Sequence, residues 1–518
     1  MSLHAVSYLL PEDFDLEGLK AALAETYSLG ENPSSNLEQT YYDSFDWRVW
    51  LAGAELLHEE GEQGGLCWSP LNEGCTPQLC QPMAQKPEFA EDLPPGPVTE
   101  QLAKVLEMRV LLPKVIITQT RQNIALLDSE EKTVVRVAWV SSEYHSVNRK
   151  QSGPLDTLLM VMPLRGYEAA FEKVIERLQA FRLSPCDHSL FRAAMGHLGI
   201  KPGDYASKLN YNLDPDARSD ATAKRILLGL LDTLEANVAG AKANLDSEFL
   251  HDLRVATRRT RSAMSQIKGA FDPQELETFK QGFAWIGQIT GQTRDLDVYL
   301  LQYHHYRTSL PAAVRPDLDP FHDYLKRHHK SAHARLVKKL NSPHFRKILK
   351  SWRDFLEAPL SDQPKGPNAK VPAAQLADRR IGKLYSKILQ QGAAIGPNSP
   401  GEQMHELRKQ CKKLRYMMEF FQSLYPKPEI RHLIKLLKVL LDNLGEFQDL
   451  EVQAHSLEGF GSEMLKEGAP ASALMAMGIL VGKLYEKQAL TRRAFAQLFT
   501  EFSSSENEKA FRKLFGGA

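Results

Sequence analysis

Cysteine is scarce in this chain, which has five in 518 residues, none of them in CxxC spacing. That pattern argues against a disulfide framework or a structural zinc site, so we expect reduced thiols. Long apolar runs are absent too, because no segment approaches the roughly 20 apolar residues that a membrane span needs. The N-terminus, MSLHAVSYLLPEDFD, has no basic region before its brief apolar stretch, unlike a secretory signal. We therefore expect a cytoplasmic protein.

Net charge is also absent overall, but the two signs are unevenly distributed. Residues 1–218 contain 19 Lys and Arg against 31 Asp and Glu, a balance of −12, which leaves +12 for the remainder. A basic region attracts polyanions, whereas an acidic one repels them. A chain of this length is expected to form two to four domains. We expect the binding function to lie after residue 218.

The hydrophobic periodicity changes along the chain. Residues 1–182 mix helical and strand patterns and predict an α+β domain, with a Gly- and Pro-rich loop over 61–100. A second Pro/Gly/Asp zone predicts a linker over 183–218. From 219 onward the 3.6-residue periodicity predicts an all-α domain of about eight helices, four before and four after a flexible segment at 358–372.

One basic motif occurs twice in the helical part. HDLRVATRRTR at 251–261 and HELRKQCKKLR at 405–415 align with an offset of 154. The same offset aligns TRDLD at 293–297 with FQDLE at 447–451. One offset that fits two separate motifs indicates an internal duplication. We expect two four-helix units related by a pseudo-twofold axis.

The cations of each motif form a stripe on an ideal helix. At 100° per residue, Arg254, Arg258 and Arg261 lie within about 80° of His251, while Arg259 points to another side. Like charges at these spacings repel, so a partner should supply negative charge. Acidic side chains within the bundle could do so, and so could an external polyanion such as polyphosphate, a phosphorylated small molecule or nucleic acid.

These motifs identify a resemblance. Their order and spacing over 219–515 are similar to those of the CHAD family, the histidine-containing α-helical domain. The resemblance implies two helical lobes, at 219–357 and 373–515, that bind inorganic polyphosphate in a basic groove and associate with polyphosphate granules. The implied contacts, with two further lysines from a neighbouring helix, are His251, Arg254, Arg258, Arg259, Arg261, His405, Arg408, Lys412, Lys413, Arg415, Lys435 and Lys438.

Metal binding and catalysis are not expected in the helical domain. The motif histidines stand among cations, which disfavour a divalent ion. We interpret His329 and His333, although spaced i, i+4, as surface residues or polyanion contacts. Asp295 and Asp449 are expected to form salt bridges that hold an arginine of the basic helix, because no nucleophile or metal cluster accompanies them.

The N-terminal part resembles a CYTH domain, the triphosphate tunnel β-barrel that often precedes CHAD, around YYDSFDWRVWLAGAELLHEEG. Active members begin with an alternating ExExK strand that holds metal and triphosphate, but this chain has LHAVSYLL there. We therefore expect 1–182 to be a degenerate, non-catalytic CYTH-like domain without a cofactor. Five cations remain as candidate anion contacts: Arg109, Lys114, Arg121, Arg136 and Arg165.

Two alternatives stay open beside polyphosphate binding. A CYTH-type inorganic triphosphatase would need Mg²⁺ and the missing acidic ligands. A nucleic-acid module would need aromatic stacking platforms, and Tyr416 is the main aromatic residue in the basic stripes. The sequence does not predict the oligomeric state.

Overall fold

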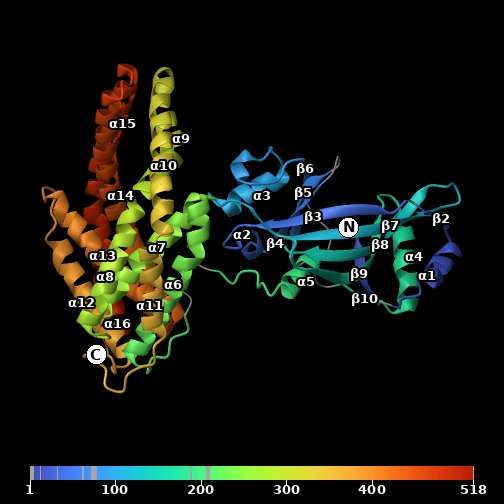
Figure 1. Ribbon diagram of the computed structural model, residues 1–518, viewed down its shortest axis with the longest axis horizontal. Helices are drawn as coiled ribbons and strands as arrows, with labels where there is room; N and C mark the ends of the chain where they lie inside the picture. Colours follow the sequence, from blue (N-terminus) through green and yellow to red (C-terminus); the bar gives the residue numbers. More distant parts are fainter. Residues whose placement is uncertain are drawn as a thin grey trace. The chain divides into compact units, whose positions relative to one another are not determined.

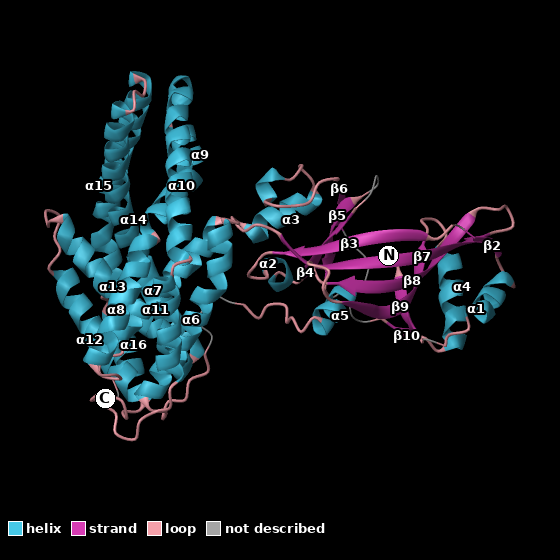
Figure 2. Ribbon diagram, viewed as in Figure 1, coloured by secondary structure: helices cyan, strands magenta, loops and turns pink. Residues whose placement is uncertain are grey.

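The computed structural model describes residues 5–11, 13–31, 33–60, 64–71, 79–186, 189–205 and 211–516. The chain divides into two compact units, residues 1–206 and 207–518. Strands occur only in the first unit and the long helices in the second, among the residues described (Figures 1 and 2). An antiparallel sheet domain is thus followed by a helical region, as the change of periodicity predicts.

The first unit is built on one antiparallel sheet with strand order β10-β1-β9-β8-β7-β3-β4-β5-β6, with β2 pairing to β7. The strands are β1 Val6–Leu10, β2 Ser28–Glu31, β3 Ser35–Asp43, β4 Ala54–Glu59, β5 Gly65–Pro70, β6 Leu79–Pro82, β7 Leu112–Leu127, β8 Thr133–His145, β9 Ser152–Pro163 and β10 Ser184–Pro185. Its helices are α1 Leu16–Ala24, α2 Arg48–Leu51, α3 Pro97–Leu106, α4 Glu168–Leu178 and α5 Leu190–His197.

This sheet is not closed into the barrel that the CYTH resemblance implies. Within the described residues the path of paired strands ends at β10 on one side and at β6 on the other. Both terminal strands are short and end in proline, Pro185 and Pro82. Proline has no amide hydrogen to donate to a further strand, which is a physical reason for the sheet to remain open.

Helices cover the sheet through separate apolar clusters. α1 and α4 pack over one end, where Leu23 and Val174 meet Val135 and Val161. α5 lies near the middle, where Phe191 stacks on Tyr41 with ring centroids 5.1 Å apart. The range 183–218 that suggests a linker therefore contains β10 and α5, both packed on the sheet domain.

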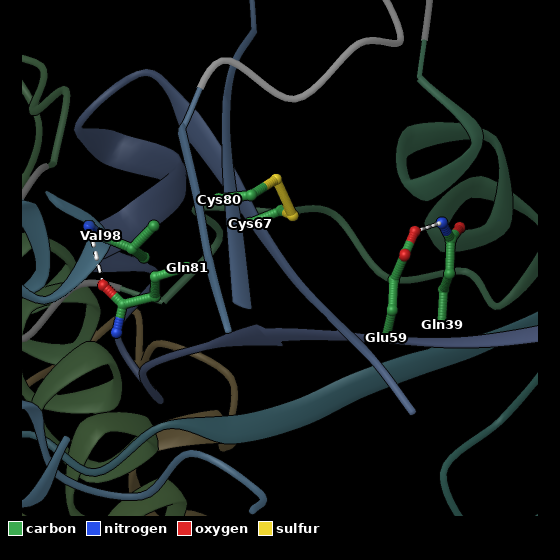
Figure 3. Close-up of a disulfide and its surroundings, with 6 residues drawn as sticks. All are labelled: Gln39, Glu59, Cys67, Cys80, Gln81 and Val98. Carbon is green, nitrogen blue, oxygen red and sulfur yellow. Dashed lines mark hydrogen bonds between the residues drawn. A yellow bond between two sulfur atoms is a disulfide. The ribbon is translucent and has the colours of Figure 1, made fainter. Parts of the chain in front are cut away.

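One disulfide links the last two strands of this sheet. Cys67 of β5 lies directly opposite Cys80 of β6 in the antiparallel register, and the two are bonded (Figure 3). The expectation of reduced thiols is wrong for this pair, because a hairpin register brings together residues whose spacing alone shows no pattern. The next residue, Gln81, accepts from the amide of Val98 at 3.1 Å and so caps the start of α3. Cys75 lies outside the described residues.

The second unit contains eleven α-helices in its described part. They are α6 Ser219–Ala243, α7 Ser247–Gln266, α8 Pro273–Ile289, α9 Gly291–Ser309, α10 Asp319–Leu340, α11 Pro343–Glu357, α12 Ala373–Ala393, α13 Gly401–Phe421, α14 Lys427–Lys466, α15 Ala471–Phe502 and α16 Ser505–Phe515. Six precede the 358–372 segment and five follow it, so the prediction of four and four is wrong. None of the described helices combines the length and apolar character that crossing a membrane requires.

The offset of 154 reappears in the helix boundaries. α6 and α12 begin at 219 and 373, α7 and α13 at 247 and 401, and α8 and α14 at 273 and 427. The copies differ where α8 ends at Ile289 and α9 begins at Gly291, whereas α14 continues for 40 residues. Thr290 marks the break, since its hydroxyl donates to Ile286 O at 2.8 Å. The equivalent residue of α14 is Leu444, which has no such hydroxyl.

Candidate functional site

The two basic motifs lie on α7 and α13, which pack against each other. α7 begins at the cap residue Asp246, whose carboxylate accepts from the amides of Glu248 and Phe249. Phe249 and Leu253 are buried on the core side of α7, and Leu407 and Leu414 are buried on α13. The apolar faces fix the rotation of both helices, so their cationic faces turn away from the core.

The two motif histidines make equivalent contacts 43 residues ahead. Arg294 donates to His251 Nδ1 at 2.9 Å, and His405 Nδ1 contacts Gln448 Oε1. Because arginine only donates, His251 Nδ1 is an acceptor, while His405 Nδ1 donates to an amide oxygen. Arg294 and Gln448 are themselves related by the offset of 154. The histidines thus tie each basic helix to α9 or to the matching part of α14.

The first motif arginines are also held by equivalent segments. Arg254 donates to Gly287 O at 3.0 Å and to Thr290 Oγ1 at 2.9 Å, at the end of α8. Arg408 forms an ion pair with Asp449 at 3.0 Å, which confirms the salt bridge expected there. Burial lowers the pKa of Arg254, and the nearby charge of Arg258 lowers it further.

Asp295, the residue equivalent to Asp449, interacts with Arg254 by charge but is not ion-paired with it in the described structure. It forms no ion pair within 4 Å in the described structure, but the Arg254 charge attracts it and opposes the rise in its pKa that burial causes. A glycine lies beside each arginine at the duplicated positions: a Cβ on Gly291 would be 3.7 Å from Arg254, and one on Gly445 would be 3.5 Å from Arg408. The duplication therefore preserves the surroundings of the arginine as well as the arginine itself.

Lys412 and Arg258 bring the two motifs together. Burial lowers the pKa of Lys412 to about 8, and the charges of Arg408, Arg258 and Arg415 lower it further against the attraction of Asp449. Arg258 is exposed on α7, yet its charge acts on Lys412 of the other copy. Neither residue has an ion pair or hydrogen bond within the described part of the chain. Two cations without an ion pair in the described structure, one from each copy of the motif, therefore repel each other.

Arg259 and Arg415 are instead engaged within the domain. Arg259 donates to Glu419 Oε2 at 3.0 Å across the two helices, and Arg415 donates to Oε1 of the same carboxylate at 2.6 Å. The Glu419 side chain is only 14% exposed. One partly buried carboxylate therefore neutralises two of the cations that the sequence suggests as polyanion contacts.

The other candidate cations differ in accessibility. Arg261 of α7 and Lys435 and Lys438 of α14 are exposed, and Lys413 is partly buried. None of the four has an ion pair or hydrogen bond among the described residues. The stripe is therefore divided by the structure into paired arginines and unpaired cations.

A pocket of about 820 Å³ lies between α9, α13, α14 and α15 of this unit. Arg408, Lys412 and Arg415 line it, whereas Lys435 and Lys438 do not. Two lysines of α15 that the sequence motifs did not predict, Lys483 and Lys487, also line it. Their i, i+4 spacing places both on one face of a helix, which is the signal that would have found them. His305 of α9 lines the pocket as well.

The histidine pair of α10 turns inward. His329 Nε2 contacts Asp297 Oδ1 at 2.7 Å, and His333 Nε2 contacts Ala241 O at 2.9 Å. Their interpretation as surface residues or polyanion contacts is therefore wrong, because both rings have partners inside the bundle. Across the described residues, no group of three or more His, Cys, Asp or Glu is placed to hold a metal ion.

Of the cations proposed for the sheet domain, Arg109 is buried and Lys114 is partly buried. Arg109 is 1% exposed and lies 3.4 Å from Asp46. Lys114 lies 4.2 Å from the centre of the Trp47 ring, and burial lowers its pKa to about 8. Asp43 beside them accepts from the amides of Val49 and Trp50. This charged cluster supports the start of α2 and offers no open anion site.

Comparison with known proteins identifies the helical part. A family model described as the CHAD domain matches residues 225–458. An uncharacterised protein of Mycobacterium tuberculosis, from strains CDC 1551 and H37Rv, is 24% identical over 391 residues, 73% of this chain and 70% of that protein. The CHAD domain from the plant Ricinus communis is 23% identical, covering 56% of this chain and 94% of its own, with a TM-score of 0.47. PptA from Streptomyces chartreusis is 15% identical, covering 55% and 100%, with a TM-score of 0.42.

Proposed function

Residues 225–458 of this chain form a CHAD domain, and on that premise we propose that the protein binds inorganic polyphosphate on the cationic faces of α7 and α13. The observation that carries this proposal is the repulsion between Arg258 and Lys412, which lie on the packed helices α7 and α13 and form no ion pair among the described residues. Two cations that repel each other are stabilised most by a polyanion that contacts both, because it removes the repulsion as well as adding attraction.

Binding is expected to be electrostatic and independent of register. A repeated phosphate presents the same group at every step, so Lys412 acts as a point charge and Arg258 as a fork for phosphate oxygens. Arg261 and Lys413 extend the cationic surface along the same two helices. By analogy with nucleic acids, counterion release should make the affinity depend steeply on salt.

The sheet domain is assigned no catalytic role in this proposal. Strand β1 has the sequence VSYLL where an ExExK strand would supply metal ligands. The sheet has a short strand at each edge, β10 and β6. We regard this unit as a degenerate CYTH-like domain and the protein as a cytoplasmic component of polyphosphate granules. The triphosphatase alternative requires metal-dependent phosphate release from tripolyphosphate by the full chain. A nucleic-acid module would require single-stranded nucleic acid to displace long polyphosphate at equal salt.

The test is a titration of the full chain with long-chain polyphosphate across a salt series. We expect Arg258→Glu combined with Lys412→Glu to weaken binding at least tenfold and to flatten the salt dependence. Lys466→Glu, on an exposed lysine of α14 without an ion pair among the described residues, is the control for a single charge reversal and should have less than a twofold effect. Unchanged affinity in the double variant would remove the α7–α13 surface from consideration.

Arg254 and Arg408 are less suitable for this test. Arg254 binds the end of α8, and Arg408 is paired with Asp449. Glutamate at 254 would lose the hydrogen bonds to the end of α8, and glutamate at 408 would lie beside Asp449, so either change would alter stability together with binding. The choice of Arg258 and Lys412 separates the two effects.

A further inference from the structure

The pocket between α9, α13, α14 and α15 is lined by cationic and by aliphatic side chains, and α14 adds three carboxylates, Asp442, Glu446 and Asp449. α13 contributes three cations to it, Arg408, Lys412 and Arg415. α14 and α15 contribute six aliphatic side chains: Val439, Leu441, Leu450, Leu480, Leu484 and Leu498. Two tyrosines, Tyr306 of α9 and Tyr416 of α13, also line the pocket.

Inorganic polyphosphate alone does not account for this lining. Its outer surface consists of charged oxygens, so it gains nothing from aliphatic walls and loses hydration when it approaches them. A ligand with phosphoryl groups at one end and an apolar ring at the other would use both kinds of wall, because its ring would bury apolar surface against α14 and α15. The pocket volume of about 820 Å³ lies in the range of small-molecule sites.

The pairing of the cations points to a short phosphoryl group. Arg408 is bound to Asp449, Arg415 to Glu419 and Lys487 to Glu446. Lys483 donates to Ser309 O. Of the five Lys and Arg side chains in the lining, Lys412 alone has neither an ion pair nor a hydrogen bond in the described structure. A long polyanion would need a row of such free cations, whereas a compact ligand needs one anchor.

We propose that this pocket binds a small organic polyphosphate of the nucleoside triphosphate class. Its phosphoryl end lies against α13 at Lys412, and its ring lies against the aliphatic side chains of α14 and α15, with Tyr416 available for stacking. The inference rests on the proposed function, because Lys412 belongs to the same cationic surface, and it adds a second class of ligand to that surface.

The probes are adenosine triphosphate and inorganic tripolyphosphate, compared by calorimetric titration of the full chain at one salt concentration without metal. Both carry a triphosphate, so their difference isolates the organic part. We expect adenosine triphosphate to bind about tenfold more tightly. Equal affinity, or tighter binding of tripolyphosphate, would overturn the proposal.

Two valines of α14 provide a matched pair of variants. Val439 lines the pocket and is 46% exposed, and Val452 is 51% exposed and does not line it. Val439→Gln should weaken adenosine triphosphate binding about fivefold and change tripolyphosphate binding by less than twofold. Val452→Gln should change neither. Because both side chains are already exposed, neither substitution threatens the fold. Equal loss of both ligands in Val439→Gln would show that the apolar wall has no selective role.

Long-chain polyphosphate, titrated in parallel, separates this inference from the proposed function. Tight, salt-sensitive polyphosphate binding with no adenosine triphosphate binding would reject the pocket and keep the cationic surface. Absence of binding for all three ligands would reject both. Lys412→Met should weaken all three, because each is expected to meet that ammonium group.

Discussion

Arg408 donates to Asp449 at 3.0 Å, and both side chains line the pocket between α9, α13, α14 and α15. The carboxylate is 60% exposed while the arginine is only 17% exposed. The guanidinium of Arg408, which an incoming phosphate would contact, is thus already ion-paired with a partly solvated carboxylate. The arginine is held in position, but an external anion must compete with its internal partner.

Removing that competing charge should strengthen polyanion binding. We expect Asp449→Asn to raise the affinity for long-chain polyphosphate about threefold at low salt, because the amide keeps the shape of the side chain without its charge. Glu429→Gln, at an exposed acid of α14 that forms no ion pair with any residue that the structure describes, is the control and should have a smaller effect. Titration at two salt concentrations measures the difference, and a loss of affinity in Asp449→Asn would mean that positioning outweighs neutralisation.

Polyphosphate affinity should depend on pH through Lys412. Burial and neighbouring cations lower the pKa of this lysine to about 8 in the free protein. Only the protonated form attracts phosphate, so affinity should be highest below pH 8 and fall by about tenfold as pH rises through 8 toward 9.5. Titrations at pH 7 and pH 9.5 measure this change. Lys412→Met should bind weakly at both pH values, and a pH-dependence unchanged by that substitution would assign it to another group.

The same lysine should lower the stability of the fold. Its folded pKa of about 8 is below the value of about 10.4 for an unfolded chain. The destabilising effect is therefore fully present below pH 8 and disappears above roughly pH 10, so this residue makes stability rise with pH. We expect Lys412→Met to increase the free energy of unfolding by about 1 kcal/mol at pH 7, because methionine fills a similar volume without charge. Denaturant unfolding at pH 7 and pH 9.5 tests both statements, and lower stability of the variant would contradict them.

The disulfide should stabilise the sheet domain. Cys67 and Cys80 are 13 residues apart, and closing a loop of this size restricts the unfolded chain by about 3 kcal/mol. We expect Cys67→Ser combined with Cys80→Ser to lower the thermal midpoint of this domain, and a reductant to have the same effect on the wild type. The reductant should leave the double variant unchanged. Peptide mapping under non-reducing conditions identifies the bond, and a wild type insensitive to reductant would exclude a stabilising role.

The sequence by itself determined where the basic helices lie and how they repeat. The offset of 154 found in two short motifs also relates the starts of α6 and α12, α7 and α13, and α8 and α14. Hydrophobic periodicity and turn residues act over a few positions, so helices can be predicted from them without knowledge of the tertiary structure. The helical geometry also separated Arg259, which turns to Glu419, from Arg258 and Arg261, which are exposed.

Only the tertiary structure decided which cations remain available. Arg259 and Glu419 are 160 positions apart, so their ion pair depends on how α7 packs against α13. The division of one helix copy into α8 and α9, the inward turn of His329 and the register that joins Cys67 to Cys80 likewise depend on contacts between distant segments. The sequence gives the number of cations that a helix carries. Whether each cation is neutralised depends on the carboxylates that the fold brings close to it, because the Coulomb energy depends on the distance between two charges in space and not on their separation in the sequence.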